Sequence, residues 1–179
     1  MPDAPRQIRV DLPGGGPCRA VLWHQDALSD VPFSPEEWLA PEERAELETL
    51  GSDKRRREWL AARAALKDLL VRDGIARRHA DAIVRKDARG APRLVVWEPD
   101  TFRYAELACA ISHCAPFVLC AYLPGRGARV GVDVERRSWR LGRLGRKFVS
   151  PEDRMLEKDD ASGDETVLWS FKESLSKLL

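Results

Sequence analysis

The stretch ACAISHCAPFVLCAYL, residues 108–123, is nearly continuous in apolar side chains. Apolar runs of this kind are typical of strands that are buried on both faces of a sheet. We predict one strand over Ala108–Ser112 and a second over Pro116–Leu123, with the second central in the sheet. Strand-like pieces also occur upstream, at Ile83–Arg85 and Arg93–Trp97.

Residues 52–74 predict a long helix. Ser52 suits the N-cap position and Gly74 the C-terminal stop. Between them, apolar residues recur at the spacing of about 3.6 residues per turn that places them in one buried stripe: Trp59, Ala62, Leu66, Leu69 and Leu70. Two shorter helices begin with a proline in the first turn, at Pro35 and Pro41.

Three basic residues flank this stripe: Arg56, Arg63 and Lys67. Long basic side chains beside a core usually lay their methylene groups along it and keep the charged end in water. The same residues could instead form a basic ledge for phosphate. The pattern leaves both interpretations open.

Composition bounds the class of protein. The chain has 179 residues, with 30 Lys and Arg against 29 Asp and Glu and a net charge of +1. Bulk charge therefore does not indicate nucleic acid or a membrane surface as partner. No apolar run approaches the roughly 18–20 residues that span a bilayer, and residues 1–6 lack the apolar core of a signal peptide, so we expect a cytoplasmic protein. Its cysteines predict buried free thiols: Cys18, Cys109, Cys114 and Cys120.

The segment Pro124-Gly125-Arg126-Gly127 is the best linker candidate. We predict an N-terminal lobe over residues 1–124 and a C-terminal lobe over residues 129–179. The second lobe offers one strand and about two helices, which is little surface to bury. Its last helix carries an apolar stripe that still runs at the terminus: Leu168, Phe171, Leu175 and Leu178. We therefore expect this lobe to be incomplete.

Two short segments carry the chemistry. The first, Gly131-Val132-Asp133-Val134-Glu135, alternates as a strand does, so that Asp133 and Glu135 share one face. A solvated edge strand would show the same pattern, but the valines on the other face indicate packing, and aspartate is depleted in strands. Two like charges on one face repel each other unless a cation lies between them.

The second segment is WSFKESLSK, Trp169–Lys177, which predicts a helix with Glu173 and Lys177 one turn apart. A surface salt bridge would explain that pair, but Trp169 on the same side favours a face turned toward a cleft. Brought together, the two segments would place three carboxylates and an ammonium group around one point. Such a site suits a hard divalent cation and a phosphate-bearing substrate.

Two further features have open interpretations. Ser112-His113 ends a predicted strand, and this histidine is either structural or, with the serine hydroxyl, a phosphate contact. The segment Arg136–Lys147 is the most basic one and holds an aromatic residue and two leucines. It could be a solvated surface, a docking surface for an acidic protein, or a nucleic-acid arm, which the balanced charge of the chain argues against.

The two chemical segments, in this order and at this separation, resemble the signatures of the 4'-phosphopantetheinyl transferase superfamily, in its pseudo-dimeric Sfp-type branch. Those signatures are Gly-apolar-Asp-apolar-Glu and Trp-Ser-x-Lys-Glu-(Ala/Ser)-x-x-Lys. Ser112-His113-Cys114, the helix beginning at Asp53, and Phe148–Glu152 also resemble elements of that family. The resemblance covers about residues 40 to 179.

The resemblance implies an α+β fold made of a pseudo-twofold pair of small lobes, each a mostly antiparallel sheet with a long helix, the second lobe being truncated here. The site would lie in the cleft between the lobes. One departure is Ala91, where the family often has a basic residue on coenzyme A. Arg89 or Arg93 would take its place.

The implied activity transfers the 4'-phosphopantetheine arm of coenzyme A to a serine hydroxyl of an apo acyl or peptidyl carrier protein, as a holo-[acyl-carrier-protein] synthase does, and releases adenosine 3',5'-bisphosphate. The resemblance implies Mg²⁺ held by Asp133, Glu135 and Glu173, catalysis by Asp133, by Glu173 as general base and by Lys177 on the leaving phosphate, and carrier-protein docking on Arg136–Lys147. It implies that coenzyme A contacts a further set of residues: Arg56, Arg63, Arg93, Ser112, His113 and Lys172.

The pathway of the carrier protein, whether fatty acid, polyketide or nonribosomal peptide assembly, does not follow from the sequence. The alternative function is a non-catalytic binding module, or an inactive fragment, that contacts an acidic protein or nucleic acid through the basic segment 136–147.

Overall fold

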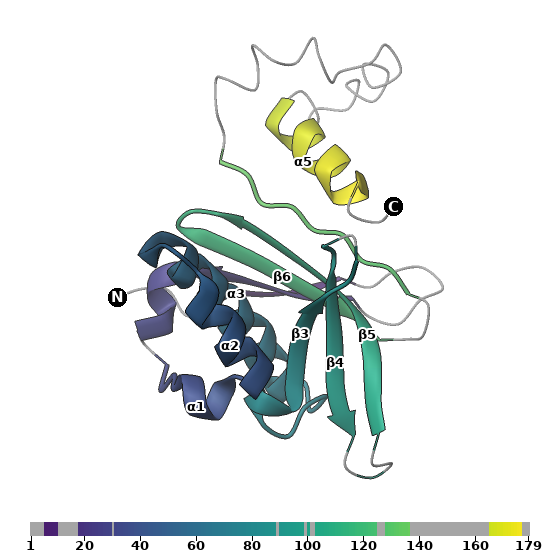
Figure 1. Ribbon diagram of the computed structural model, residues 1–179. Coiled ribbons are helices and arrows are strands. Elements are labelled where there is room, and N and C mark those ends of the chain that lie inside the picture. The colour runs from purple at the N-terminus through teal and green to yellow at the C-terminus, as the bar shows by residue number, and fades with distance from the viewer. Residues whose placement is uncertain are drawn as a thin grey trace.

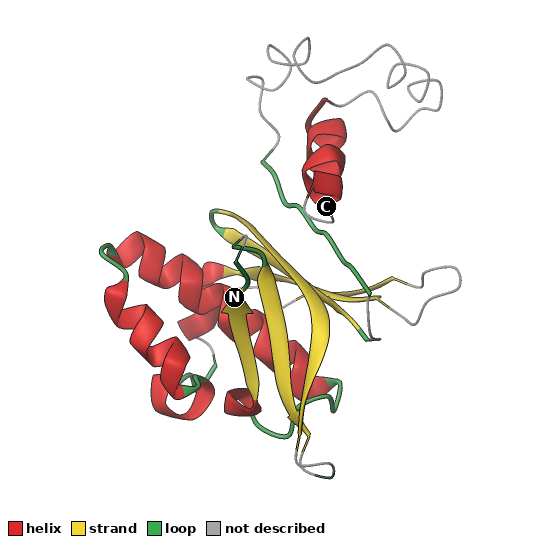
Figure 2. Ribbon diagram, turned by 45° about the vertical axis from the view of Figure 1, so that its right-hand side comes forward, coloured by secondary structure: helices red, strands yellow, loops and turns green. Residues whose placement is uncertain are grey.

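The computed structural model describes residues 6–10, 18–29, 31–88, 90–98, 100, 103–124, 128–136 and 165–176. These residues form one antiparallel sheet, a group of helices on one of its faces, and a separate helix beyond the other face (Figures 1 and 2). The expected α+β class is confirmed by this arrangement.

The sheet has six strands in the order β1-β2-β6-β5-β4-β3, and each neighbouring pair is antiparallel. The strands are β1 Arg6–Val10, β2 Cys18–His24, β3 Ala82–Lys86, β4 Pro92–Glu98, β5 Arg103–Cys114 and β6 Phe117–Leu123. As predicted from its apolar sequence, β6 lies inside the sheet, between β2 and β5. Strand β5 begins earlier than predicted, because its polar first half still pairs with β4.

The helices begin close to their predicted starts. They are α1 Pro35–Trp38, α2 Pro41–Thr49, α3 Asp53–Arg72 and α5 Glu165–Ser176, with short 3-10 turns η1 Gln25–Ser29 and η2 His79–Asp81. At the start of α3 the Ser52 hydroxyl accepts a hydrogen bond from the backbone N–H of Arg55 at 3.3 Å. After its end Gly74 has a φ of 71°, so the predicted cap and stop are both confirmed.

The larger core lies between α3 and one face of the sheet. The predicted apolar stripe of α3 is buried, from Leu66 at 0% exposed to Trp59 at 9%. Ala62, Leu66, Leu69 and Leu70 of this stripe pack in one cluster with side chains of the central strands. Among these are Trp23 of β2 and Val118 of β6, which are both fully buried. This packing fixes α3 across the sheet.

Two of the three basic residues beside the stripe, Arg63 and Lys67, differ from both interpretations drawn above, while Arg56 is exposed. Lys67 is 0% and Arg63 5% exposed, so neither side chain reaches water or offers an open ledge. The Lys67 ammonium donates to Glu43 Oε2 at 2.6 Å, to the His79 carbonyl at 3.1 Å and to the Ala82 carbonyl. The reason is a buried carboxylate on α2, which gives these cations a partner inside the fold.

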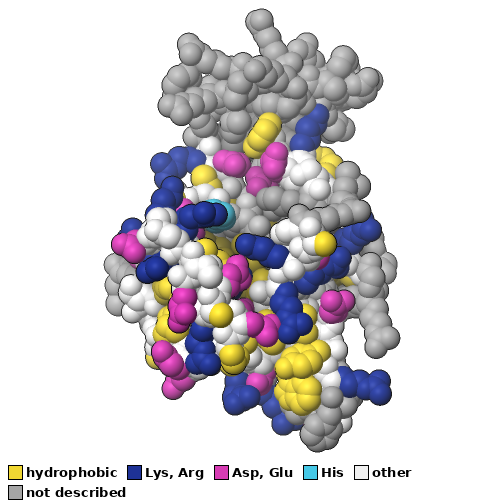
Figure 3. Space-filling model, in the orientation of Figure 1, with side chains coloured by type: hydrophobic (Ala, Val, Ile, Leu, Met, Phe, Trp, Pro, Cys, Tyr) yellow, Lys and Arg dark blue, Asp and Glu magenta, His cyan; other side chains and the backbone are white. Residues whose placement is uncertain are grey.

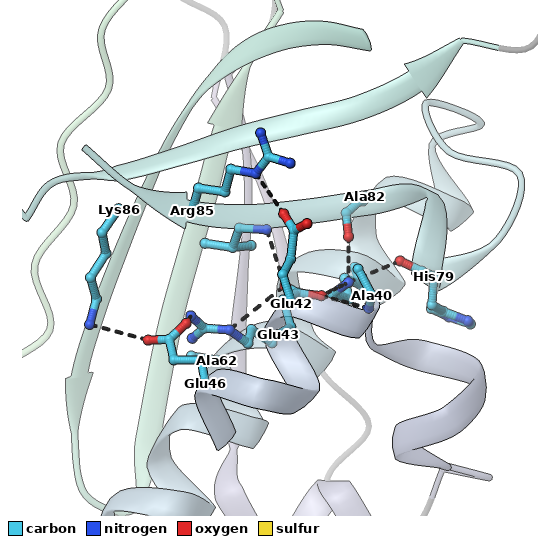
Figure 4. Close-up of polar contacts among 12 residues, drawn as sticks. Ala40, Glu42, Glu43, Glu46, Ala62, His79, Ala82, Arg85 and Lys86 are labelled. Atoms are coloured by element: carbon cyan, nitrogen blue, oxygen red, sulfur yellow. Dashed lines mark hydrogen bonds and ion pairs between the residues drawn. The ribbon is translucent and has the colours of Figure 1, made fainter. Parts of the chain in front are cut away.

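That carboxylate, Glu43, is the centre of a polar network (Figure 4). It is 2% exposed and also accepts hydrogen bonds from the backbone N–H groups of Ala40 at 3.0 Å and Val84 at 3.1 Å. Arg63 Nε lies 3.7 Å from Glu43, and the same guanidinium donates to Glu46 at 2.9 Å. The network therefore joins α2, α3 and β3.

Part of the opposite face of the sheet packs against residues 128–132. Val130 and Val132 pack there against a small cluster from β2 and β6: Cys18, Ala20, Ala121 and Leu123. The strand predicted over Gly131–Glu135 is wrong, because residues 128–136 belong to no helix or strand. The strands beneath already pair along both edges, so the segment lies over the sheet rather than extending it (Figure 1).

The cysteines are all free. Cys18, Cys109 and Cys120 are buried and Cys114 is half-buried, so the prediction of buried free thiols is confirmed for three of the four. In the described part of the chain no helix is both long enough and apolar enough to cross a bilayer.

The predicted lobe boundary falls largely on residues 125–127, which lie outside the described residues. The division into lobes 1–124 and 129–179 therefore stays a prediction.

Gly74 provides a test of the stop signal after α3. Its φ of 71° is a conformation that L side chains adopt at a cost, while a Cβ added there would meet nothing within 4 Å. Gly74→Ala is therefore expected to lower the free energy of unfolding by about 1 kcal/mol through backbone strain alone. Gly51→Ala is the matched control, because an added Cβ also meets nothing there and the backbone is outside the left-handed region. Urea denaturation that shows equal effects of the two variants would contradict this account.

Candidate functional site

The two signature segments meet at the carboxylate of Asp133. Ser112 Oγ donates a hydrogen bond to Asp133 Oδ1 at 2.8 Å. Ser170 Oγ donates to Asp133 Oδ2 at 2.6 Å. One hydroxyl comes from β5 and the other from α5, so this contact joins the sheet, the segment 128–136 and the signature helix.

Strand alternation explains why Ser112 lies there. On β5, Cys109 belongs to the core on the α3 side, so Ser112 points to the opposite face. Its register partner on β6 is Leu119, which packs against the cluster under residues 128–132. Ser112 is 7% exposed, and its hydroxyl also accepts from the Val134 N–H at 3.3 Å.

The helix α5 presents its polar side to this contact. Ser170 meets Asp133, and Glu173 lies one turn further along the same side of the helix, half-buried. The apolar side is turned away, with Phe171 56% and Leu175 43% exposed. The prediction that Lys177 joins this face concerns a residue outside the described part of the chain.

The three predicted metal ligands have the right chemistry but are not gathered. Carboxylate oxygens suit a hard divalent cation such as Mg²⁺. Asp133 takes part in the serine contacts, Glu173 lies on α5, and Glu135 is exposed. Within the described ranges, no three acidic, histidine or cysteine side chains lie close enough together to hold a metal ion.

His113 lies beside the first turns of α3. Its side chain is 53% exposed, and Nε2 lies 3.7 Å from Glu58 Oε2 on α3. Glu58 also lies 3.8 Å from Lys54 one turn earlier. No signal in the sequence indicates Glu58, because its neighbour His113 is brought close only by the packing of α3 on the sheet.

The arginines predicted to bind coenzyme A have three different surroundings. Arg63 is buried, with its guanidinium carbon 3.4 Å from the centroid of the Trp59 ring, and belongs to the Glu43 network. Arg56 is exposed and donates from Nε to the Leu50 carbonyl at 2.8 Å. These contacts stabilise the fold, and the phosphate roles of both residues stay predictions.

The third arginine, Arg93, lines a pocket of about 810 Å³. The pocket lies against the start of β4, the middle of β5 and residues 128–130, and its walls include small residues such as Ala91 and Ala108. Arg129 is a second basic residue in this lining, and Arg93 Nε lies 3.4 Å from Asp87. Two guanidinium groups beside small apolar residues suit a ligand with both an anionic and a flat apolar part.

Cys109 also lines the pocket. Burial raises the pKa of its thiol to about 12. The thiol is therefore protonated at neutral pH and is not an activated nucleophile.

The surface of the described residues mixes both signs of charge. Figure 3 shows basic and acidic side chains interspersed over one face, in keeping with the net charge of +1. Of the predicted docking segment Arg136–Lys147 only Arg136 is described, and its guanidinium donates to the Ala115 carbonyl at 2.9 Å.

Comparisons with known proteins find similarity to solved structures. No protein-family model and no curated protein sequence matches this chain. The chain is similar to the crystal structure of holo-ACP-synthase from Plasmodium yoelii, with 14% sequence identity and a TM-score of 0.46. The similarity covers 66% of this chain and 95% of that one. At this level it establishes neither family nor activity.

Proposed function

We propose that this chain is a 4'-phosphopantetheinyl transferase, which moves the arm of coenzyme A to a serine hydroxyl of an apo acyl or peptidyl carrier protein. The observation that carries the proposal is the 2.6 Å contact between the two signature segments, from Ser170 to Asp133. The two residues are distant in the chain, and this hydrogen bond joins them in the fold. The free state of all four cysteines fits a reducing cytoplasmic setting.

The 810 Å³ pocket is the proposed place for the nucleotide part of coenzyme A. Arg93 and Arg129 would contact its phosphates, since guanidinium groups form paired hydrogen bonds with phosphate oxygens. Arg93 lines the pocket together with Ala91 and is our candidate for the basic group that the motif lacks at that position. His113 lies near Glu58 on the α3 side and does not line this pocket, so its contact with the adenosine end of coenzyme A stays a separate prediction.

In the proposed reaction the carrier serine oxygen attacks the phosphorus that bears the pantetheine. The bond from that phosphorus to the bridging oxygen breaks, and adenosine 3',5'-bisphosphate leaves with the electron pair. Glu173 would accept the proton of the serine hydroxyl, as general base. Lys172, half-buried on the same helix, would hold a coenzyme A phosphate, and Lys177 would stabilise the leaving phosphate.

Asp133, Glu135 and Glu173 would have to come together to hold Mg²⁺, because they are not gathered in this structure; the ion would supply neutralisation of the pyrophosphate charge. Asp133 reaches α5 through Ser170, so one of the three ligands is already tied to the helix that carries another. The carrier protein, with its acidic docking helix, would meet the basic segment Arg136–Lys147.

The test of the proposal is the intact mass of apo carrier proteins after incubation with this protein, coenzyme A and magnesium chloride. We expect the mass of a carrier from fatty acid, polyketide or nonribosomal peptide assembly to rise by one phosphopantetheine arm. Omission of coenzyme A is the control and should leave the mass unchanged. If none of the three carrier types gains the arm while circular dichroism shows a folded protein, the proposal is wrong.

A further inference from the structure

We propose that Ser112 and Ser170 are positioning residues that hold the Asp133 carboxylate in its working orientation. The inference rests on the proposed function, because it assigns a role within the same site. It also replaces the expected role of Ser112, which the resemblance places on coenzyme A.

The hydrogen-bonding capacity of Ser112 supports the assignment. A serine hydroxyl has one proton to donate. Ser112 uses it toward Asp133 Oδ1 at 2.8 Å and accepts from the Val134 N–H at 3.3 Å. With 7% of its surface exposed, the hydroxyl has little access to a ligand. Ser112 therefore fixes both the side chain of Asp133 and the backbone that follows it.

Ser170 completes the arrangement from the other side. Its hydroxyl donates to Oδ2 at 2.6 Å, within the short range typical of hydrogen bonds to an ionised acceptor. The terminal torsion of an aspartate is otherwise broadly distributed. Donors on both oxygens, from two different elements, restrict the plane of the carboxylate.

The same contact places the proposed general base. Ser170 and Glu173 lie three residues apart and so share one side of α5. Because Phe171 and Leu175 on the other side are exposed, apolar packing of that side does not hold α5 against residues 128–136. The Ser170 hydroxyl therefore helps to set the distance from Glu173 to Asp133.

The expected consequence is that loss of either serine hydroxyl lowers the rate of transfer without weakening coenzyme A binding. Most of the pocket lining comes from β4, β5 and residues 128–130 rather than from α5. Loss of either hydroxyl should therefore misplace the reacting groups while leaving the pocket in place. A small misplacement of reacting groups costs up to about 100-fold in rate.

The experiment measures kcat and the KM for coenzyme A in Ser170→Ala and Ser112→Ala. We expect kcat to fall about 10- to 100-fold in each, with KM changed by less than about threefold. Ser170→Thr retains a hydroxyl and should restore most of the rate. Ser174→Ala is the matched control, because the Ser174 hydroxyl donates to the Ser170 carbonyl of its own helix at 2.8 Å; its rate should match that of the wild type.

A second readout does not depend on activity. In the protein without ligands, amide hydrogen exchange over residues 165–176 should be faster in Ser170→Ala than in Ser174→Ala, because α5 loses its attachment to Asp133. Equal exchange and equal kcat in these two variants would overturn the inference. A raised KM with unchanged kcat in Ser112→Ala would return Ser112 to coenzyme A binding. Failure of the proposed function is recognised separately, as a wild-type protein that transfers no arm.

Discussion

Replacement of Glu43 by glutamine is expected to lower the free energy of unfolding by about 3–5 kcal/mol, the usual cost of breaking a buried ion pair from one side. The substitution keeps the size of the side chain and removes its charge. Lys67, 0% exposed, would keep its hydrogen bonds to the carbonyls of His79 and Ala82 but lose its counter-charge. Urea denaturation followed by circular dichroism measures the change.

A matched control and a double variant sharpen this prediction. Glu42→Gln lies on the same helix and removes an exposed partner of Arg85, so its effect should stay below about 1 kcal/mol. Glu43→Gln combined with Lys67→Met removes both charges of the Glu43–Lys67 pair and should be less destabilised than the sum of the single variants. Additive effects would contradict an ion pair as the source of the stability.

The loss of unfolding free energy in Glu43→Gln should depend on pH. Burial lowers the pKa of the Lys67 ammonium from its ordinary value, and Glu43 opposes that shift. Without Glu43 the folded state binds this proton more weakly still, while the unfolded chain retains it up to a pKa of 10.5. Lower pH therefore favours the unfolded variant, and the stability deficit relative to wild type should shrink as the pH rises from neutral toward that value.

The second large effect is expected on activity. Glu173→Gln should reduce kcat for transfer of the arm by about 100- to 10,000-fold, the range typical of a general base. Glutamine has nearly the same shape but cannot take the proton of the carrier serine. Coenzyme A binding and circular dichroism should remain close to wild type, because the pocket lining does not include Glu173.

Glu48→Gln on α2 is the control for this variant, since it removes an exposed carboxylate away from the signature segments. Its rate should equal that of the wild type. Transfer at the wild-type rate by Glu173→Gln would remove the base assignment and leave the carboxylate as a metal ligand only.

Local signals in the sequence were sufficient for much of the fold. Ser52 and Gly74 marked the ends of α3 because capping depends on the chemistry of one or two residues. The apolar run of β6 showed that it lies inside the sheet, since only a strand covered on both faces needs apolar residues at every position. These features depend on neighbours in the chain.

The failures concern partners that are distant in the chain. Residues 131–135 alternate between apolar and acidic side chains, as a strand does. Such alternation shows only that the two sides of the segment have different surroundings. It does not show that the backbone forms hydrogen bonds with a neighbouring strand. Lys67 and Arg63 were expected at the surface because nothing near them in sequence predicts Glu43 on another helix. The hydrogen bond from Ser112 to Asp133 could likewise not be predicted from the sequence, because the two residues are brought together only by the path of the chain after β6.

The path of residues 128–136 over the sheet (Figure 1) also restricts the length of the segment that carries Asp133. Val132 lies against the small cluster on the sheet, and its successor Asp133 faces the two serines. Because these contacts come from adjacent residues, an insertion or deletion of one residue between Val130 and Asp133 would move the carboxylate away from the serine hydroxyls while Val130 stays on the sheet. Length variation in this protein should therefore be tolerated elsewhere before it is tolerated between Val130 and Asp133.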